Sequence, residues 1–230
     1  MSPDEIKKIA LKYFGETQII RRHLHANPEL SWEETETSKF ISEKLKQHQI
    51  KHFTGIAKHG IVAIIKGKNA DKKCIALRAD MDALPIQETN NLEYASIVKN
   101  KMHACGHDVH MSSALAAAFI LNDLKEEFTG TVKLIFQPSE EKMPSGAKAM
   151  IEEGVLNDPK VDAVIATHVT PELEVGKVGF CKGPFMASAD EIYLSIIGKG
   201  GHAASPHKCI DPILISAHII VALQQIDNKF

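Results

Sequence analysis

The chain has 230 residues, of which 44% are hydrophobic and 24% are charged, and its formal net charge is -2 at pH 7. This composition is typical of a globular protein with room for one large domain or two smaller ones. The near-neutral charge argues against nucleic acid or an anionic membrane as a partner, and no apolar run reaches the roughly 18 residues that a membrane span needs.

The N-terminal part is predicted to be helical. Residues 4–26 carry apolar side chains at helical spacing, and the charged pattern of residues 1–15 indicates an amphipathic helix rather than a signal peptide. Pro28 interrupts this pattern. Ser31, with Glu34 three residues later, then predicts an N-cap and a capping box that open a second helix through about Gln49.

Four short runs rich in Val, Ile or Leu and bounded by turn-forming residues predict strands at 60–66, 74–78, 132–136 and 161–167. A long Ala-rich helix over about 106–127 lies between the second and third strands. A shorter helix over about 146–153, ended by Gly154, lies between the third and fourth. This alternation predicts an α/β fold, with a mainly parallel sheet flanked by helices.

The pattern changes near residue 184. Residues 189–198 alternate between apolar and polar side chains, which predicts a half-solvated strand, and residues 211–225 predict an apolar helix with Pro212 in its first turn. We therefore expect a first domain over 1–183 and the first strand and helix of a second domain over 184–230. Because one strand and one helix cannot bury a core of their own, this unit is expected to pair with another chain or with the rest of its domain.

The densest group of potential metal ligands lies in residues 103–110. A Cys two positions before a His can place sulfur and nitrogen on one divalent ion, and this ligand set suits zinc and related transition metals. Cys105 and His107 are the strongest candidates, and His103, Asp108 and His110 are predicted to orient them. The alternative is a buried thiol beside an imidazole at a helix start.

Further candidates follow the predicted strands, and the carboxyl ends of parallel strands are where sites form. Asp80 and Asp82 follow the strand over 74–78, Glu140 and Glu141 follow the strand over 132–136, and His168 follows the strand over 161–167. Adjacent residues of an extended chain point to opposite sides, so one glutamate can bind metal while the other faces the attacking water. We expect these groups to share one site.

Each of these residues also has a purely structural interpretation. The two glutamates can be a solvated acidic pair, the two aspartates can end a strand and cap the turn before Pro85, and His168 can be a core or surface histidine. His202 follows two glycines that permit a close backbone approach. It can reach a substrate if the domains close or if a dimer partner supplies the site, and it is otherwise a surface turn residue.

Several motifs of the chain, and the order in which they occur, resemble those of the M20 metallopeptidase family. The closest likeness is to its amidohydrolase branch, which includes hippurate hydrolase, auxin-conjugate hydrolases, N-acetyl-diaminopimelate deacetylase and thermostable carboxypeptidases. The resemblance covers essentially the whole chain and rests on His23-Leu-His25-Ala-Asn-Pro28-Glu29-Leu30-Ser31, Leu77-Arg-Ala-Asp80-Met-Asp82-Ala-Leu-Pro85, Met102-His-Ala-Cys105-Gly-His107-Asp108-Val-His110, Phe136-Gln-Pro-Ser-Glu140-Glu141, His168-Val, Met186-Ala-Ser-Ala-Asp190 and Gly198-Lys-Gly-Gly-His202-Ala-Ala.

The resemblance implies a catalytic domain like that of di-zinc exopeptidases, with two divalent metal ions that can be zinc, manganese, cobalt or nickel. It also implies an inserted α+β lid domain that often forms the dimer interface. By the same resemblance, Cys105 bridges the metals, and the terminal ligands are His107, Glu141 and His168.

The resemblance also implies roles for four residues that do not bind metal. Glu140 is the general base, and Asp82 orients a metal ligand. Asp80 stands where other branches of the family have a histidine ligand, whose role His107 takes over. His202 matches a lid histidine that binds the scissile carbonyl.

The function implied is hydrolysis of the amide bond of N-acyl amino acids or short peptides by a metal-activated water. The expected setting is the cytoplasm, because the four cysteines are scattered rather than arranged as a disulfide framework. The resemblance also implies a homodimer formed through the lid. By resemblance, the rest of the lid, the last part of the catalytic domain and a final metal-binding histidine lie outside this chain. Two alternatives stay open: a catalytically incomplete metal-binding remnant or interaction module, and a metallocarboxypeptidase or dipeptidase.

Overall fold

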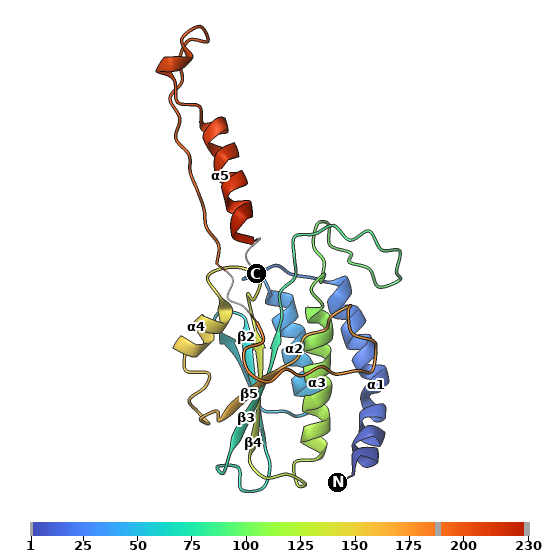
Figure 1. Cartoon of the computed structure of the whole chain (residues 1–230). Helices are drawn as coiled ribbons and strands as arrows, with labels where there is room; N and C mark the ends of the chain where they lie inside the picture. The colour runs from blue at the N-terminus through green and yellow to red at the C-terminus, as the bar shows by residue number, and fades with distance from the viewer. Residues whose placement is uncertain (1, 187–189, 228–230) are drawn as a thin grey trace. The chain divides into compact units, whose positions relative to one another are not determined.

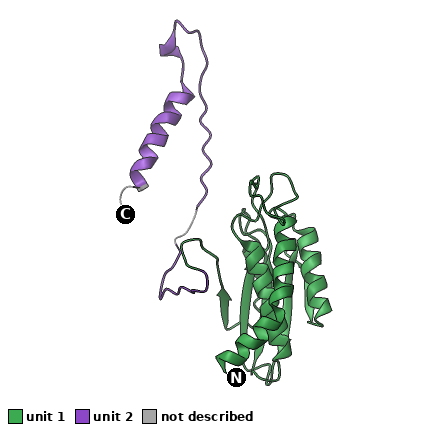
Figure 2. Ribbon diagram, turned by 90° about the vertical axis from the view of Figure 1, so that its right-hand side faces the viewer, with its two compact units in different colours: residues 1–174 green, residues 175–230 purple. Residues whose placement is uncertain are grey.

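A computed structural model describes residues 2–186 and 190–227 of the chain. The chain divides into two compact units, Met1–Glu174 and Val175–Phe230 (Figure 2). The division after Glu174 falls before the domain boundary expected after residue 183, which stays a prediction. Within the described residues, no helix combines the length and apolar character needed to cross a membrane.

The first unit is built on a five-stranded sheet with strand order β1-β2-β4-β3-β5 (Figure 1). The strands are β1 (His52–Ile56), β2 (Gly60–Lys66), β3 (Cys74–Asp80), β4 (Thr131–Gln137) and β5 (Ala163–Ala166). β3 runs parallel to both of its neighbours, β4 and β5. β2 is antiparallel to β1 and β4. The α/β class is confirmed, and β2, together with the unexpected strand β1, makes the sheet mixed.

Helices cover both faces of this sheet. Helices α1 (Pro3–Ala26), α2 (Thr35–Gln47) and α3 (His107–Asp123) lie on one face, and α4 (Gly146–Glu152) lies on the other (Figure 1). The alternation of side chains along β4 explains the two cores, because successive residues of a strand point to opposite faces. Phe136 belongs to the large core under α1–α3, whereas Ile135 belongs to a smaller core with Met150 of α4.

The start of α2 differs from the sequence-based expectation. The helix begins at Thr35, and its N-cap residue Glu34 makes no side-chain capping bond. Glu29 instead accepts the backbone N–H groups of Glu36 and Thr37 in the first turn of the helix. The capping box predicted from Ser31 and Glu34 is therefore wrong, because these two side chains bond to other loops.

The second unit contains little paired backbone. Its described elements are an isolated bridge between Lys199 and Ile210, a 3-10 turn (Pro206–Lys208) and helix α5 (Pro212–Asp227), which matches the expected apolar helix. The strand predicted over 189–198 is not formed over 190–198, where no residue pairs with a neighbouring strand. Residue 189, like the rest of 187–189, lies outside the described residues. An alternating pattern gives a strand only where a second strand accepts its hydrogen bonds.

A buried polar network ties the end of α1 to the start of α3. The ring of His25 lies between two carboxylates, with Nδ1 3.0 Å from Asp108 Oδ2 and Nε2 3.2 Å from Glu88 Oε1. Arg21 also donates to Asp108, through Nε at 2.8 Å. The hydrogen bond to Asp108 raises the pKa of His25 although burial opposes the shift. Both carboxylate side chains are only 1% exposed, and His25 therefore helps to keep them ionised, together with Arg21 at Asp108 and the N–H of Ser96 at Glu88.

Replacing His25 with Gln should lower the free energy of unfolding by about 2 kcal/mol at about pH 6, because both carboxylates lose a charged partner. The pKa of His25 is raised above 6.5 in the folded chain. Its stabilising contribution is therefore complete below about pH 6.5 and is lost as the pH rises through the folded-state pKa. Urea unfolding of the whole chain should show a smaller difference between wild type and variant at about pH 9. A difference that stays constant or grows with pH would contradict this assignment.

Candidate metal centre

Most candidate residues lie at or just beyond the carboxyl ends of the parallel strands β3, β4 and β5. Asp80 ends β3, and Asp82 lies two residues beyond it, while Cys105 and His107 stand at the start of α3. Their side chains come together with those that follow β4 and β5, namely Glu140, Glu141 and His168. The convergence predicted from the strand ends is therefore present in the first unit.

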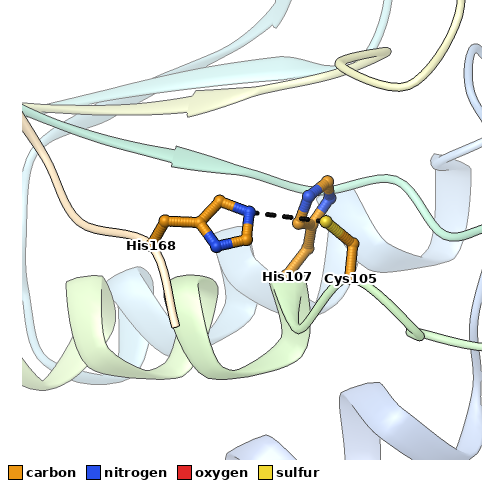
Figure 3. A group of neighbouring side chains, drawn as sticks. All are labelled: Cys105, His107 and His168. Carbon is orange, nitrogen blue, oxygen red and sulfur yellow. Dashed lines mark hydrogen bonds between the residues drawn. The ribbon is translucent and has the colours of Figure 1, made fainter. Parts of the chain in front are cut away.

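Cys105, His107 and His168 form one potential ligand group, whose ligand atoms all lie within 4.8 Å of one another (Figure 3). Sγ of Cys105 is 3.4 Å from Nε2 of His168. Nδ1–H of His107 donates to the backbone oxygen of Asp82 at 2.8 Å, which leaves Nε2 as the atom that can bind a metal. This Nε2 is buried and has no hydrogen-bond partner.

The glutamate pair closes the group from the side of β4. Oε1 of Glu141 lies 3.7 Å from Nε2 of His107 and is also buried without a partner. The side chain of Glu140 is 40% exposed and that of Glu141 is 21% exposed, so the two neighbours differ in their access to solvent. Buried polar atoms are nearly always paired, and a cation between these two atoms would satisfy both of them.

The pKa values in the group reflect burial and nearby negative charge. Burial, together with the nearby carboxylates of Glu141 and Glu140, raises the pKa of Cys105 to about 12. Burial and the charge of Glu141 raise the pKa of Glu140. Burial lowers the pKa of His107, but the hydrogen bond and charge of the aspartates outweigh burial and raise it. A bound divalent cation would neutralise this charge.

A thiolate, two imidazoles and a carboxylate fit zinc and its neighbours among the divalent metals. A second grouping, Asp80 with His107 and His110, fits a metal less well. His110 already uses both ring nitrogens, since Nδ1 donates to Asp80 at 2.7 Å and Nε2 accepts the N–H of Val169 at 3.0 Å. His110 thus connects Asp80 to the backbone beside His168.

Gly106 allows the segment after β5 to approach the start of α3. It is the N-cap residue of α3 with a φ of 89°, in the region that favours glycine. A Cβ at this position would lie 2.4 Å from Cγ2 of Val169. Both the backbone conformation and the close approach therefore require glycine between Cys105 and His107.

Asp82 contacts both His107 and the loop that carries the two glutamates. Its carboxylate accepts the backbone N–H of Glu140 at 3.0 Å and that of Glu141 at 2.9 Å, as well as the hydroxyl of Ser31 at 2.6 Å. Its backbone oxygen accepts the Nδ1–H of His107 at 2.8 Å, and its Oδ1 lies 3.6 Å from the same nitrogen. Burial alone would raise the pKa of Asp82, but His107 and these donors lower it. The ionised carboxylate therefore fixes the backbone of the glutamate loop.

Asp80 has its own set of partners. Burial would raise its pKa, but His110, His107 and Arg78 lower it to about 2. Arg78 donates to Asp80 through Nη1 at 2.5 Å and to Gln137 through Nε at 2.8 Å. The sequence-based interpretation missed Arg78, although a charged residue inside an apolar strand is a signal of such a role.

His202 belongs to the second unit. There its Nδ1 accepts the backbone N–H of Ala204 at 3.1 Å, and its side chain is exposed. Its expected contact with a substrate stays a prediction.

Known proteins are similar to this chain in sequence. The family described as Peptidase family M20/M25/M40 matches residues 76–226. The N-acyl-L-amino acid amidohydrolase of Geobacillus stearothermophilus is 41% identical over 230 residues, which are 100% of this chain and 61% of the relative. Hippurate hydrolase of Campylobacter jejuni is 46% identical over 215 residues, or 94% of this chain and 55% of the relative.

A solved structure is also similar. The Bacillus subtilis YXEP protein, described as a dinuclear metal binding peptidase from the M20 family, matches with a TM-score of 0.70 and 44% identity, over 77% of this chain and 48% of that one. The chain spans 61% or less of the length of each of these three proteins. Because the family match covers most of its residues, this chain belongs to peptidase family M20/M25/M40.

Proposed function

We propose that this chain carries the metal site of an amidohydrolase that cleaves the amide bond of N-acyl amino acids. The observation that carries the proposal is the pair of buried, unpartnered atoms, Nε2 of His107 and Oε1 of Glu141, that lie 3.7 Å apart beside Cys105 and His168. Relatives named for N-acyl amino acids and hippurate support the substrate class.

Two divalent metal ions would be held by four residues, Cys105, His107, Glu141 and His168. When bound, such ions polarise the scissile carbonyl and make a water molecule more acidic. A dinuclear metal site is described for the similar Bacillus subtilis protein, which supports the number of ions.

Glu140 would act as the general base. Its carboxylate takes a proton from the attacking water as the new C–O bond forms, and it returns the proton to the leaving nitrogen as the C–N bond breaks. Its partly exposed side chain lies beside the ligand group, and its raised pKa brings it closer to neutral pH, where such a transfer works best. His202 would stabilise the negative charge that develops on the carbonyl oxygen.

We also propose that two copies pair through the second unit and that the protein works in the cytoplasm. Apolar side chains of α5 are exposed around the helix, for example Ile213, Ile220 and Ile226. Large exposed apolar surfaces indicate an interaction site. All four cysteines lie among the described residues and are free thiols, as expected in a reducing compartment.

The metal site can be tested with cobalt. Replacing Cys105 with Ser should remove the thiolate-to-cobalt absorption band. It should also weaken Co²⁺ binding by more than about 100-fold, since the loss of a residue that only hydrogen-bonds to a ligand typically costs about 10–100-fold. Cys209→Ser is the matched control, because this thiol belongs to the second unit, and it should bind as wild type does. An unchanged band in Cys105→Ser would rule out the cysteine as a ligand.

The base can be tested by hydrolysis. In the full-length protein supplied with metal, Glu140→Gln should lower kcat for N-acetyl amino acids and hippurate by at least about 100-fold, because no carboxylate remains to take the proton. Metal binding should persist. Retained turnover would reject the base assignment, and a metal-loaded wild type inactive on all N-acyl amino acids would reject the amidohydrolase proposal.

The dimer can be tested by light scattering. Ile220→Glu puts a charge on the exposed apolar surface of α5 and should shift the chain from dimer to monomer. Leu11→Glu, at an equally exposed apolar position of α1, is the control and should leave the mass unchanged. A monomeric wild type, or dimers in both variants, would contradict pairing through α5.

A further inference from the structure

We propose that the segment Ser31–Glu34 is a positioning element of the metal site, and that Glu34 fixes the backbone of the loop that carries Glu140 and Glu141. This inference rests on the proposed function. It replaces the capping role that the sequence suggested for Ser31 and Glu34.

Each residue of the segment Ser31–Glu34 bonds to a different point around the site. The four contacts reach the turn after β3, the loop after β4 and the chain that leads to Cys105. They are Ser31 Oγ to Asp82 Oδ2 at 2.6 Å, Trp32 Nε1 to the oxygen of Pro144 at 3.1 Å, Lys101 Nζ to Glu33 Oε2 at 2.8 Å and the N–H of Ser139 to Glu34 Oε1 at 2.7 Å. One short segment therefore holds three separate parts of the site.

Glu34 is the buried member of this segment. It is 0% exposed, its Oε2 has no hydrogen-bond partner, and burial raises its pKa. Burying a carboxyl group is costly, and an apolar residue would fill the space at a lower cost. The helix does not need Glu34 as a cap, since Glu29 accepts two N–H groups in the first turn of α2. The bond from the N–H of Ser139 needs an acceptor oxygen, which an apolar side chain at position 34 could not provide.

Ser139 needs such a partner because of its backbone conformation. It is fully buried and has a φ of 45°, which is unfavourable for a residue other than glycine. Its hydroxyl donates to the oxygen of Lys142, and its own oxygen accepts the N–H of Gly146. These bonds hold the turn from one side, and Glu34 holds it from the other.

Three successive backbone N–H groups are thus accepted by two carboxylates. The N–H of Ser139 goes to Glu34, and those of Glu140 and Glu141 go to Asp82. The directions of the two glutamate side chains follow from this backbone. A small misplacement of a reacting group can cost about 100-fold in rate. The carboxylates of Glu34 and Asp82 therefore affect the reaction by fixing the positions of Glu140 and Glu141.

Two variants of Glu34 separate this role from simple packing. Glu34→Met keeps the approximate volume but removes the acceptor for Ser139. It should weaken Co²⁺ binding by the whole chain by about 10–100-fold and change the cobalt d–d spectrum. Glu34→Gln keeps an acceptor oxygen, and its affinity and spectrum should be close to those of wild type.

Glu153→Met is the control for losing a carboxylate that accepts a backbone N–H, at an exposed position. Glu153 also accepts a backbone N–H through its carboxylate, that of Ala57 at 2.9 Å, and Ala57 lies between β1 and β2 rather than in a loop of the site. Its loss should lower the free energy of unfolding without changing cobalt binding by the folded chain. Equal cobalt affinities in Glu34→Met and wild type, or equal losses in Glu34→Met and Glu153→Met, would overturn the inference.

A milder pair of variants applies if Glu34→Met does not fold. Ser31→Ala removes one donor from Asp82, whereas Ser42→Ala removes a similar half-buried hydrogen bond, to His52 at 2.8 Å. Only Ser31→Ala should weaken cobalt binding, and equal binding in both would overturn the role of the segment. A wild type that binds no cobalt at all would reject the proposed function itself, and this result does not depend on any variant of the segment.

Discussion

Both oxygens of the Asp82 carboxylate accept backbone N–H groups from the loop after β4, while its backbone oxygen accepts the Nδ1–H of His107. One residue therefore couples the end of β3, the glutamate loop and the first turn of α3. A buried carboxylate remains ionised only when donors surround it, and here two N–H groups, a hydroxyl and a nearby imidazole serve this purpose. The relative positions of Glu140, Glu141 and His107 depend on these bonds.

The sheet topology determines which strands can contribute to the site. β4, β3 and β5 are neighbours and run parallel, so their carboxyl ends lie along one edge. β2 is antiparallel to β4, and its carboxyl end lies at the opposite edge. Asp80, Asp82, Glu140, Glu141 and His168 lie at or just beyond the ends of the three parallel strands, and no candidate follows β2, although β2 is also apolar and largely buried. The direction of a strand, rather than its burial, therefore determines whether site residues follow it.

The sequence predicted the parts of this site that depend on local pattern. Short apolar runs located β2–β5, and the spacing of Cys105 and His107 indicated a ligand pair. The partners of Ser31 and Glu34 could not be predicted, because a serine followed three residues later by glutamate has the same pattern whether it caps a helix or bonds a distant loop. Tertiary contacts decide between these outcomes. β1 was missed for a related reason, since its mostly exposed residues depend on pairing with β2.

The acidic groups of the site fall into two classes, and the hydrogen bonds explain the difference. Asp80 and Asp82 have their own donors, and their pKa values are lowered in spite of burial. Glu140 and Cys105 have few donors, and burial and neighbouring carboxylates raise their pKa values. Neighbouring groups with opposite shifts are typical of sites that divide structural from reactive roles. The aspartates can therefore hold the framework as permanent anions, while the thiol and the glutamate are the groups whose charge state a bound cation would change most.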